Sequence, residues 1–122
     1  MKKTNFETAN YIWLFNLLAF PRNNFEPMEK MIHITGDPEE GMVLLFLIHR
    51  AGYSKREERS FTDYFTCTTS WLQKEMKLTP SRQRRLLSRL EKKGFIKVTI
   101  GGMPSRRHVR LVLTDFYWPE KN

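Results

Sequence analysis

Two periods of apolar residues follow one another in the second half of the chain. The first is helical, and it is framed by Thr79 as a cap, Pro80 in the first helical position and Gly94 as the end. The inward stripe of this helix is predicted to comprise Gln83, Leu86, Leu87 and Leu90. The opposite side of the same helix is rich in arginine, so one face is expected to pack and the other to meet solvent or a ligand.

Beyond this helix the apolar period changes to two, which is the period of a β-strand. The inward positions are predicted to be Ile96, Val98 and Ile100 in one strand and Val109, Leu111 and Leu113 in the next. Gly101, Gly102 and Pro104 separate the two strands, so the pattern predicts a hairpin. The tip of this hairpin is predicted to carry Ser105, Arg106 and Arg107.

A shorter helix is predicted just before the arginine-rich one. It covers residues 70–76, with Thr68 or Thr69 as its cap, and residues 61–67 are predicted to form a short strand in front of it. The two helices then meet across a tight turn at residues 77–79. Lys77 is expected to adopt a left-handed conformation there, at a cost of about 1 kcal/mol.

The first half of the chain contains a strong helix start at Asp37. Its carboxylate is predicted to cap the helix, Pro38 to take the first helical position and Glu40 to reach back as the other half of a capping box. The helix is predicted to run to about Arg50 and to end at Gly52. Because residues 42–48 leave it almost no polar face, it is expected to be the central buried helix.

Two further segments precede this central helix. The apolar run from Phe6 to Phe20 favours a first helix that stops at Pro21, although its aromatic residues also suit a strand. Residues 22–36 are predicted to be irregular. The sequence therefore predicts one α+β domain that is mainly α-helical, with a small β-hairpin and an extra N-terminal apolar helix.

Charge adds a functional indication to this pattern. The segment from Lys74 to Arg110 holds twelve of the 21 lysines and arginines but only two of the 13 acidic residues, which gives it a charge of +10. The other 85 residues sum to −2, so the net charge of +8 belongs to one region. Such a confined basic cluster is typical of a surface that binds a polyanion, and nucleic acid is the polyanion expected.

Other function classes find little support in the composition. The single Cys67 rules out an intrachain disulfide and is predicted to lie in the core. The histidines at positions 33, 49 and 108 lack metal-ligand spacing, and no glycine-rich phosphate loop is present, so we expect no cofactor, no metal and no enzyme. The longest apolar run is too short to cross a bilayer, which favours a cytoplasmic, nucleoid-associated protein.

The run "TTSWLQKEMKLTPSRQRRLLSRLEKKGFIKV" carries a family resemblance. Residues 68–114 resemble the winged helix-turn-helix superfamily of DNA-binding domains. The ending "SRRHVRLVLTD" is similar to the wing of MarR-type regulators, and "DYFTCTTSWLQKEM" is similar to replication-organiser proteins of phages and plasmids. The chain departs from the family pattern at Gln73, Lys77 and Gln83, where a small residue, a glycine and an aliphatic residue are usual.

The resemblance implies a winged helix-turn-helix domain over residues 37–118 and an N-terminal segment over residues 1–36 for packing or homodimerisation. The function expected is sequence-specific binding of double-stranded DNA, in transcription regulation or in replication initiation of a mobile element. The alternative is a protein interaction module of the same fold without DNA specificity.

The expected contacts divide into three groups. Base edges in the major groove are assigned to Ser81, Arg82 and Arg85, on the outward side that also includes Ser88. Phosphates are assigned to Arg84, Arg89, Lys92, Lys93 and His108, and to the helix start formed by Thr69 and Ser70 with Lys74 nearby. A neighbouring minor groove is assigned to Arg106 and Arg107.

Overall fold

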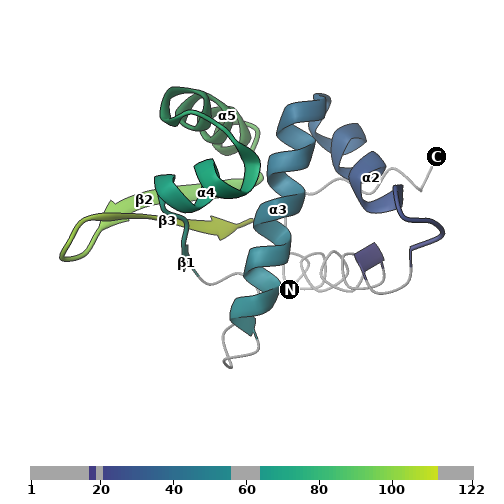
Figure 1. Cartoon of the computed structure of the whole chain (residues 1–122). Helices are drawn as coiled ribbons and strands as arrows, with labels where there is room; N and C mark the ends of the chain where they lie inside the picture. The colour runs from purple at the N-terminus through teal and green to yellow at the C-terminus, as the bar shows by residue number, and fades with distance from the viewer. Residues whose placement is uncertain (1–16, 19–20, 56–63, 113–122) are drawn as a thin grey trace, which may run out of the picture.

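The computed structural model describes residues 17–18, 21–55 and 64–112, with residues 52–55 described in their backbone only (Figure 1). This part of the chain has an α+β fold, in which helices pack with a small antiparallel sheet. The helices are α2 (Glu26–Thr35), α3 (Pro38–Lys55), α4 (Thr69–Met76) and α5 (Pro80–Lys92). The strands are β1 (Phe65–Thr66), β2 (Ile96–Gly101) and β3 (Arg106–Leu111). Helix α3 lies between α2 on one side and α4, α5 and the sheet on the other (Figure 1).

The sheet has three strands in the order β1-β3-β2, and both pairs are antiparallel. The predicted hairpin is confirmed, with Ile96 opposite Leu111 and Val98 opposite Val109. The predicted strand over residues 61–67 is reduced to β1 within the described residues, where it pairs with the central strand β3. Leu113, the last predicted inward position, lies outside the described residues.

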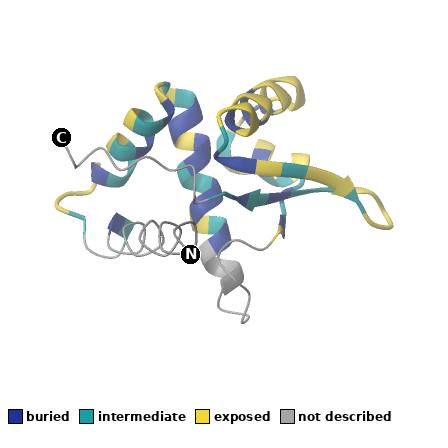
Figure 2. Ribbon diagram, turned by 180° about the vertical axis from the view of Figure 1, so that it is seen from behind, coloured by how far each residue is buried: buried dark blue, intermediate teal, exposed yellow. Residues whose placement is uncertain are grey.

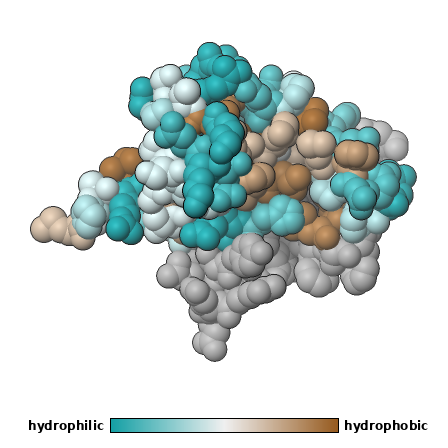
Figure 3. Space-filling model, in the orientation of Figure 1, coloured by the Kyte–Doolittle hydropathy of each residue, from teal (hydrophilic) through white to brown (hydrophobic). Residues whose placement is uncertain are grey.

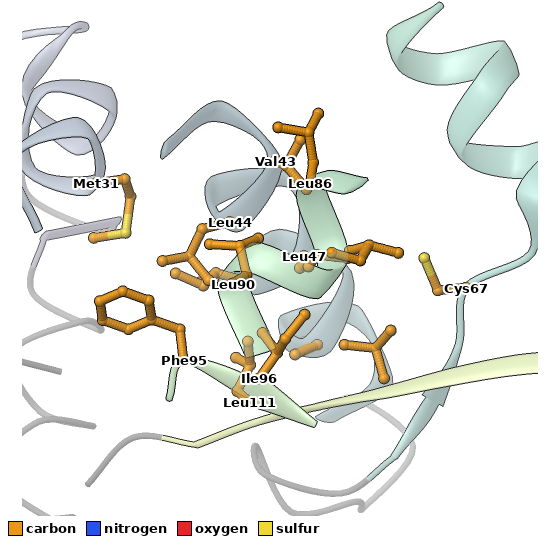
Figure 4. Packing of buried hydrophobic residues seen from close by; sticks show 14 of the residues in the cluster. Met31, Val43, Leu44, Leu47, Cys67, Leu86, Leu90, Phe95, Ile96 and Leu111 are labelled. Carbon is orange, nitrogen blue, oxygen red and sulfur yellow. The ribbon is translucent and has the colours of Figure 1, made fainter. Parts of the chain in front are cut away.

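The core lies between α3, α5 and the sheet (Figure 4). Its central labelled members are Val43, Leu44 and Leu47 on α3, Leu86 and Leu90 on α5, and Ile96 and Leu111 on the sheet. The predicted inward stripe of α5 is confirmed, because all four of its members are buried. Burying each leucine contributes about 1.5–3 kcal/mol, so this stripe fixes how α5 sits on α3.

The predicted helix caps are confirmed by their hydrogen bonds. Asp37 Oδ2 accepts from the amide of Glu40 at 3.0 Å, and Thr79 Oγ1 accepts from the amide of Arg82 at 3.3 Å. Thr68, rather than Thr69, caps α4 by accepting from an amide at 3.1 Å. Lys77 has the expected left-handed conformation, with φ of 59°. Two capped helices therefore meet at a turn whose backbone geometry is set by that one residue.

The prediction of irregular structure over residues 22–36 is wrong, because α2 occupies most of that segment. Pro27 lies in the first helical turn, where no intrahelical amide bond is required, and Gly36 ends the helix with φ of 81°. Met31 is fully buried in the same core as α3. The helix therefore forms because its apolar side has a partner, which its sequence alone does not show.

Helix α2 also approaches α3 closely at a glycine. A Cβ atom at Gly41 would lie 2.7 Å from the backbone Cα of Ile32, so the two helices could not keep this spacing with a larger residue. The prediction that α3 ends at Gly52 is wrong, since the helix continues to Lys55. An interior glycine costs a helix only about 1 kcal/mol relative to alanine, and here it does not terminate it.

Only two residues of the predicted first helix are described. Leu17 and Leu18 are helical; Leu17 is buried in the core and Leu18 packs against it. The rest of the run from Phe6 to Phe20 lies outside the described residues. These two residues add to the hydrophobic core of their own chain.

Candidate functional site

The side of α5 opposite its buried stripe forms a continuous exposed face (Figure 2). The helical repeat requires this, since residues that flank the stripe by about 100° per position must point away from α3. The contacts predicted from the sequence along α5 and at its C-cap are all exposed: Ser81, Arg82, Arg84, Arg85, Ser88, Arg89, Lys92 and Lys93. The structure thus brings the predicted contacts of α5 together, and six of the eight are cationic.

Some of these cations form ion pairs with acidic residues in the first turn of α3. Arg82 Nε lies 2.7 Å from Glu39 Oε2, and Lys93 Nζ lies 2.5 Å from Glu40 Oε1. Arg89 Nη1 is 3.6 Å from the other oxygen of Glu40. Three of the six cations therefore form ion pairs with α3. These pairs hold both ends of α5 against α3.

Glu40 is the central acid of this contact. Its side chain is only 2% exposed, so its charge must be matched by close partners. Lys93 supplies one and donates a second hydrogen bond to the carbonyl of Thr35 at 2.7 Å. The expected capping box is therefore wrong in one half, because the Glu40 carboxylate turns toward α5 instead of reaching back to Asp37.

The exposed ion pair between Arg82 and Glu39 shifts the pKa of each group toward its charged form. The hydrogen bond from Arg82, with the attraction of its charge, lowers the pKa of the Glu39 carboxyl below its ordinary value. The same hydrogen bond raises the pKa of Arg82. Both side chains are consequently charged at neutral pH, and the guanidinium of Arg82 has a resident anionic partner.

Arg84, Arg85 and Lys92 differ from these three cations. Among residues 21–55 and 64–112, none of them forms an ion pair, and all three are exposed. Their charge is available to an incoming anion without displacing an internal partner. Hydrophilic side chains gather over α4 and α5 in Figure 3, while apolar ones gather over α3.

The two adjacent arginines of the hairpin differ in exposure and in hydrogen bonding. Arg106 is exposed, and it opens β3 opposite Gly101. Arg107 is half-buried, and its Nε donates to the carbonyl of Cys67 at 2.8 Å. The prediction that Arg106 and Arg107 lie at the tip is wrong, because both belong to β3, and only Ser105 of the three predicted residues lies in the turn. Neighbouring side chains of a strand point to opposite faces, so the two arginines have different surroundings. The turn itself comprises residues 102–105.

Arg107 takes part in a buried junction that sequence reasoning missed. Its Nη2 donates to Gln83 Oε1 at 2.8 Å, and Gln83 is 0% exposed. Gln83 Nε2 in turn donates to the carbonyls of Thr69 at 3.1 Å and Leu78 at 2.9 Å. One amide side chain therefore joins α4, α5 and β3. The available signal was the presence of a glutamine within an otherwise leucine stripe, since a buried amide requires partners.

Cys67 lies beside this junction. Its side chain is buried, which confirms the predicted core position. Burial raises the pKa of the Cys67 thiol, and the nearby Arg107 guanidinium opposes that shift in part. The sulfur is therefore a protonated core group at neutral pH, poorly suited to nucleophilic chemistry.

The remaining predicted contacts lie on α4 and β3. Thr69, Ser70 and Lys74 are exposed on α4. His108 is half-buried, with its Nδ1 at 3.4 Å from Thr66 Oγ1 and its Nε2 at 3.4 Å from the carbonyl of Gly101. The structure thus groups the α4 residues with the exposed surface, whereas both His108 ring nitrogens lie near protein oxygens.

Comparisons of the chain with models of known protein families, with curated proteins and with solved structures found no match. Within the described ranges, no group of three or more His, Cys, Asp and Glu side chains is placed to hold a metal ion. No helix in that same part of the chain has the length and hydropathy needed to cross a bilayer.

Proposed function

We propose that this chain is a non-enzymatic, sequence-specific duplex DNA-binding protein of the winged helix-turn-helix type. The observation that carries the proposal is the placement of charge. The exposed face of α5 displays cations opposite a buried stripe, and the adjoining hairpin displays Arg106. A basic helix face next to a basic hairpin matches the electrostatic footprint of nucleic-acid binding. The biological role proposed is transcription regulation or assistance in replication initiation of a mobile element.

The order of elements supports this architecture. A capped helix, α4, leads through residues 77–79 into the capped helix α5, and the β2–β3 hairpin follows directly. The strand β1 pairs with β3 and so ties the start of this unit to its end. In helix-turn-helix docking, the second helix enters the major groove with its first turns closest to the bases. In this chain that helix is α5.

The ion pairs on α5 sharpen the expected division of contacts. Ser81 and Arg85 are assigned to base edges, because they are exposed near the start of α5 and Arg85 forms no ion pair among the described residues. Arg82 reaches bases only by leaving Glu39, so it contributes less than the sequence suggests. A bidentate arginine to guanine discriminates by about 1–3 kcal/mol. Arg85 is therefore the principal base reader.

The other cations position the helix without reading sequence. Arg84, Lys92 and Arg89 are assigned to phosphates, with Lys74 and the exposed Thr69–Ser70 start of α4 as a second phosphate contact. Lys93 and Arg107 hold the scaffold together through Glu40 and Gln83. We therefore assign no DNA contact to Lys93, Arg107 or His108.

Selection from a pool of random duplexes tests the proposal. Repeated capture with the full chain is expected to enrich a defined sequence, which Arg85→Ala should fail to enrich while still retaining duplex at low salt. Lys97→Ala is the matched control, since Lys97 is an exposed cation of the hairpin outside the proposed base-reading face. A chain that retains no duplex at low salt would contradict the proposal and favour the protein interaction module.

A further inference from the structure

The tip of the hairpin is unusually apolar for a surface turn. Met103 is 99% exposed and is followed by Pro104, while Ile100 is 64% exposed just before the turn. Figure 1 shows that this end of the hairpin extends away from the body of the molecule. The tip therefore holds apolar side chains in water, where nothing in the described part of the chain covers them.

The register of the sheet explains why Ile100 is exposed despite its predicted inward position. Ile96, Val98 and Ile100 share one face of β2, and exposure increases along this series from the core outward. Val98 lies opposite Val109, whereas Ile100 lies opposite Arg107, whose guanidinium is directed to Gln83. The apolar face of the strand thus continues beyond the helices that cover its first half.

The charges around the tip are all of one sign. Arg106 is exposed at the start of β3, directly after the turn, whereas Lys97 is exposed at the other end of the hairpin, opposite Arg110. The sequence contains no aspartate or glutamate from residue 92 to residue 114. An apolar tip with an exposed arginine beside it and no acidic residue nearby in the sequence is complementary to a ligand that combines an anionic rim with an apolar interior. A DNA groove has this character, because phosphates line its edges and stacked bases form its floor.

The shape of the tip favours the minor groove over a protein surface. That groove is about 6 Å wide, which admits single side chains at the end of a narrow ribbon. Stable protein interfaces bury about 800 Å² on each partner, far more than a turn of residues 102–105 presents. Methionine, isoleucine and proline are among the residues that DNA-bending proteins insert between base steps, with arginine beside them in the groove.

We propose that Met103 is an apolar wedge that enters the minor groove beside the site of α5, partly unstacks one base step and bends the duplex. Pro104 stiffens the wedge, and Arg106 lies in the same groove against the phosphates. This inference rests on the proposed duplex binding. It adds an indirect component to recognition, because pyrimidine–purine steps open more easily than others and are therefore preferred beneath the tip.

The test uses the full chain with duplexes that carry its selected sequence. 2-Aminopurine replaces adenine at each pyrimidine–purine step in turn, and dyes at the two ends report bending by energy transfer. Wild-type protein is expected to raise 2-aminopurine fluorescence at one step and to shorten the end-to-end distance. Met103→Ala should lose both signals, while the dependence of affinity on salt is unchanged because no charge is removed.

Two variants serve as controls for this experiment. Met42→Ala removes another exposed methionine, on α3, and should keep both signals. Met103→Leu retains an apolar wedge and should also keep them. Urea unfolding of Met103→Ala should give the wild-type midpoint, since the side chain is fully exposed.

The possible outcomes separate the wedge from duplex binding itself. Duplex binding without a fluorescence rise at any step overturns the wedge and leaves the proposed function standing. Equal signals from wild type and Met103→Ala also overturn it, and that is the result expected if the tip serves a protein partner. Failure of wild type to bind any duplex overturns both proposals.

Discussion

The exposed face of α5 and the tip of the β2–β3 hairpin are both basic in sequence, yet they differ in how much of that charge is free. On α5 and at its C-cap, the cations Arg82, Arg89 and Lys93 form ion pairs with acids at the start of α3. At the hairpin, Arg106 has no ion-pair partner within the described residues and stands beside an exposed apolar turn. Some of the cations therefore hold α5 against α3 through ion pairs, and only the others are available to a ligand without breaking such a pair.

The largest expected effect is a difference in the free energy of unfolding between a variant of the packed helix α5 and a variant of the exposed hairpin tip. Leu90→Ala on α5 should lower the free energy of unfolding by about 2–5 kcal/mol, because it leaves a cavity in the core. Met103→Ala at the tip should change it by less than about 0.5 kcal/mol. Urea unfolding followed by circular dichroism measures both. Equal losses would mean that the tip packs on the body of the protein.

A second prediction compares an arginine assigned to base contacts with one assigned to phosphate contacts. Arg85→Ala should remove about 1–3 kcal/mol of discrimination between the selected sequence and a scrambled duplex. Arg106→Ala should weaken binding to both duplexes by the same factor, since a contact to the phosphates carries no sequence information. Competition binding with the two duplexes gives both values. Retention of full discrimination by Arg85→Ala would place base reading elsewhere.

A third prediction compares the adjacent arginines of the hairpin. Arg107→Ala should lower the free energy of unfolding by about 1–3 kcal/mol, because it leaves the carbonyl of Cys67 and the buried oxygen of Gln83 without their donor. Arg106→Ala should leave it within about 0.5 kcal/mol of wild type. Thiol labelling gives an independent readout: the buried Cys67 should react faster in Arg107→Ala, because opening that exposes it becomes more frequent, even though loss of the guanidinium favours the protonated thiol. Identical stability of the two variants would contradict the buried junction.

The smallest effect concerns the competition between Glu39 and DNA for Arg82. Glu39→Gln removes the anion and should raise duplex affinity roughly twofold at neutral pH, as expected for an exposed pair. Because the pKa of Glu39 is lowered, the wild-type pair forms above the ordinary carboxyl pKa and is lost as the pH falls through the lowered value. The advantage of Glu39→Gln should therefore vanish in acid. A gain that persists there would contradict this account, because protonated Glu39 carries no charge with which to compete for Arg82.

Much of the second half of the fold follows from local sequence. The leucine stripe and the Thr79 cap predict α5 and its buried side, and alternation predicts the hairpin. These signals are readable because each lies within one element and repeats. Helix α2 is not predicted, although Pro27 fits the first turn of a helix and Gly36 fits its end, because the burial of Met31 depends on packing against α3.

The division of the site was less predictable because it depends on contacts between distant segments. Arg82 and Lys93 meet acids more than forty residues earlier in the chain. Arg106 and Arg107 are equivalent by residue type, and only the strand register decides which is turned to Gln83. The net charge of +10 in the basic segment can be counted from the sequence. Which of its cations form no internal ion pair depends on the fold.

The salt dependence of duplex binding tests the central proposal most directly. Anisotropy of a labelled duplex is measured with wild type and Arg106→Ala over a range of salt concentrations. With about six phosphates engaged, the slope of log K against log salt is expected to be about −5, and Arg106→Ala should reduce its magnitude by about one. A slope near zero, or an unchanged slope in Arg106→Ala together with full affinity, would contradict binding through this basic surface.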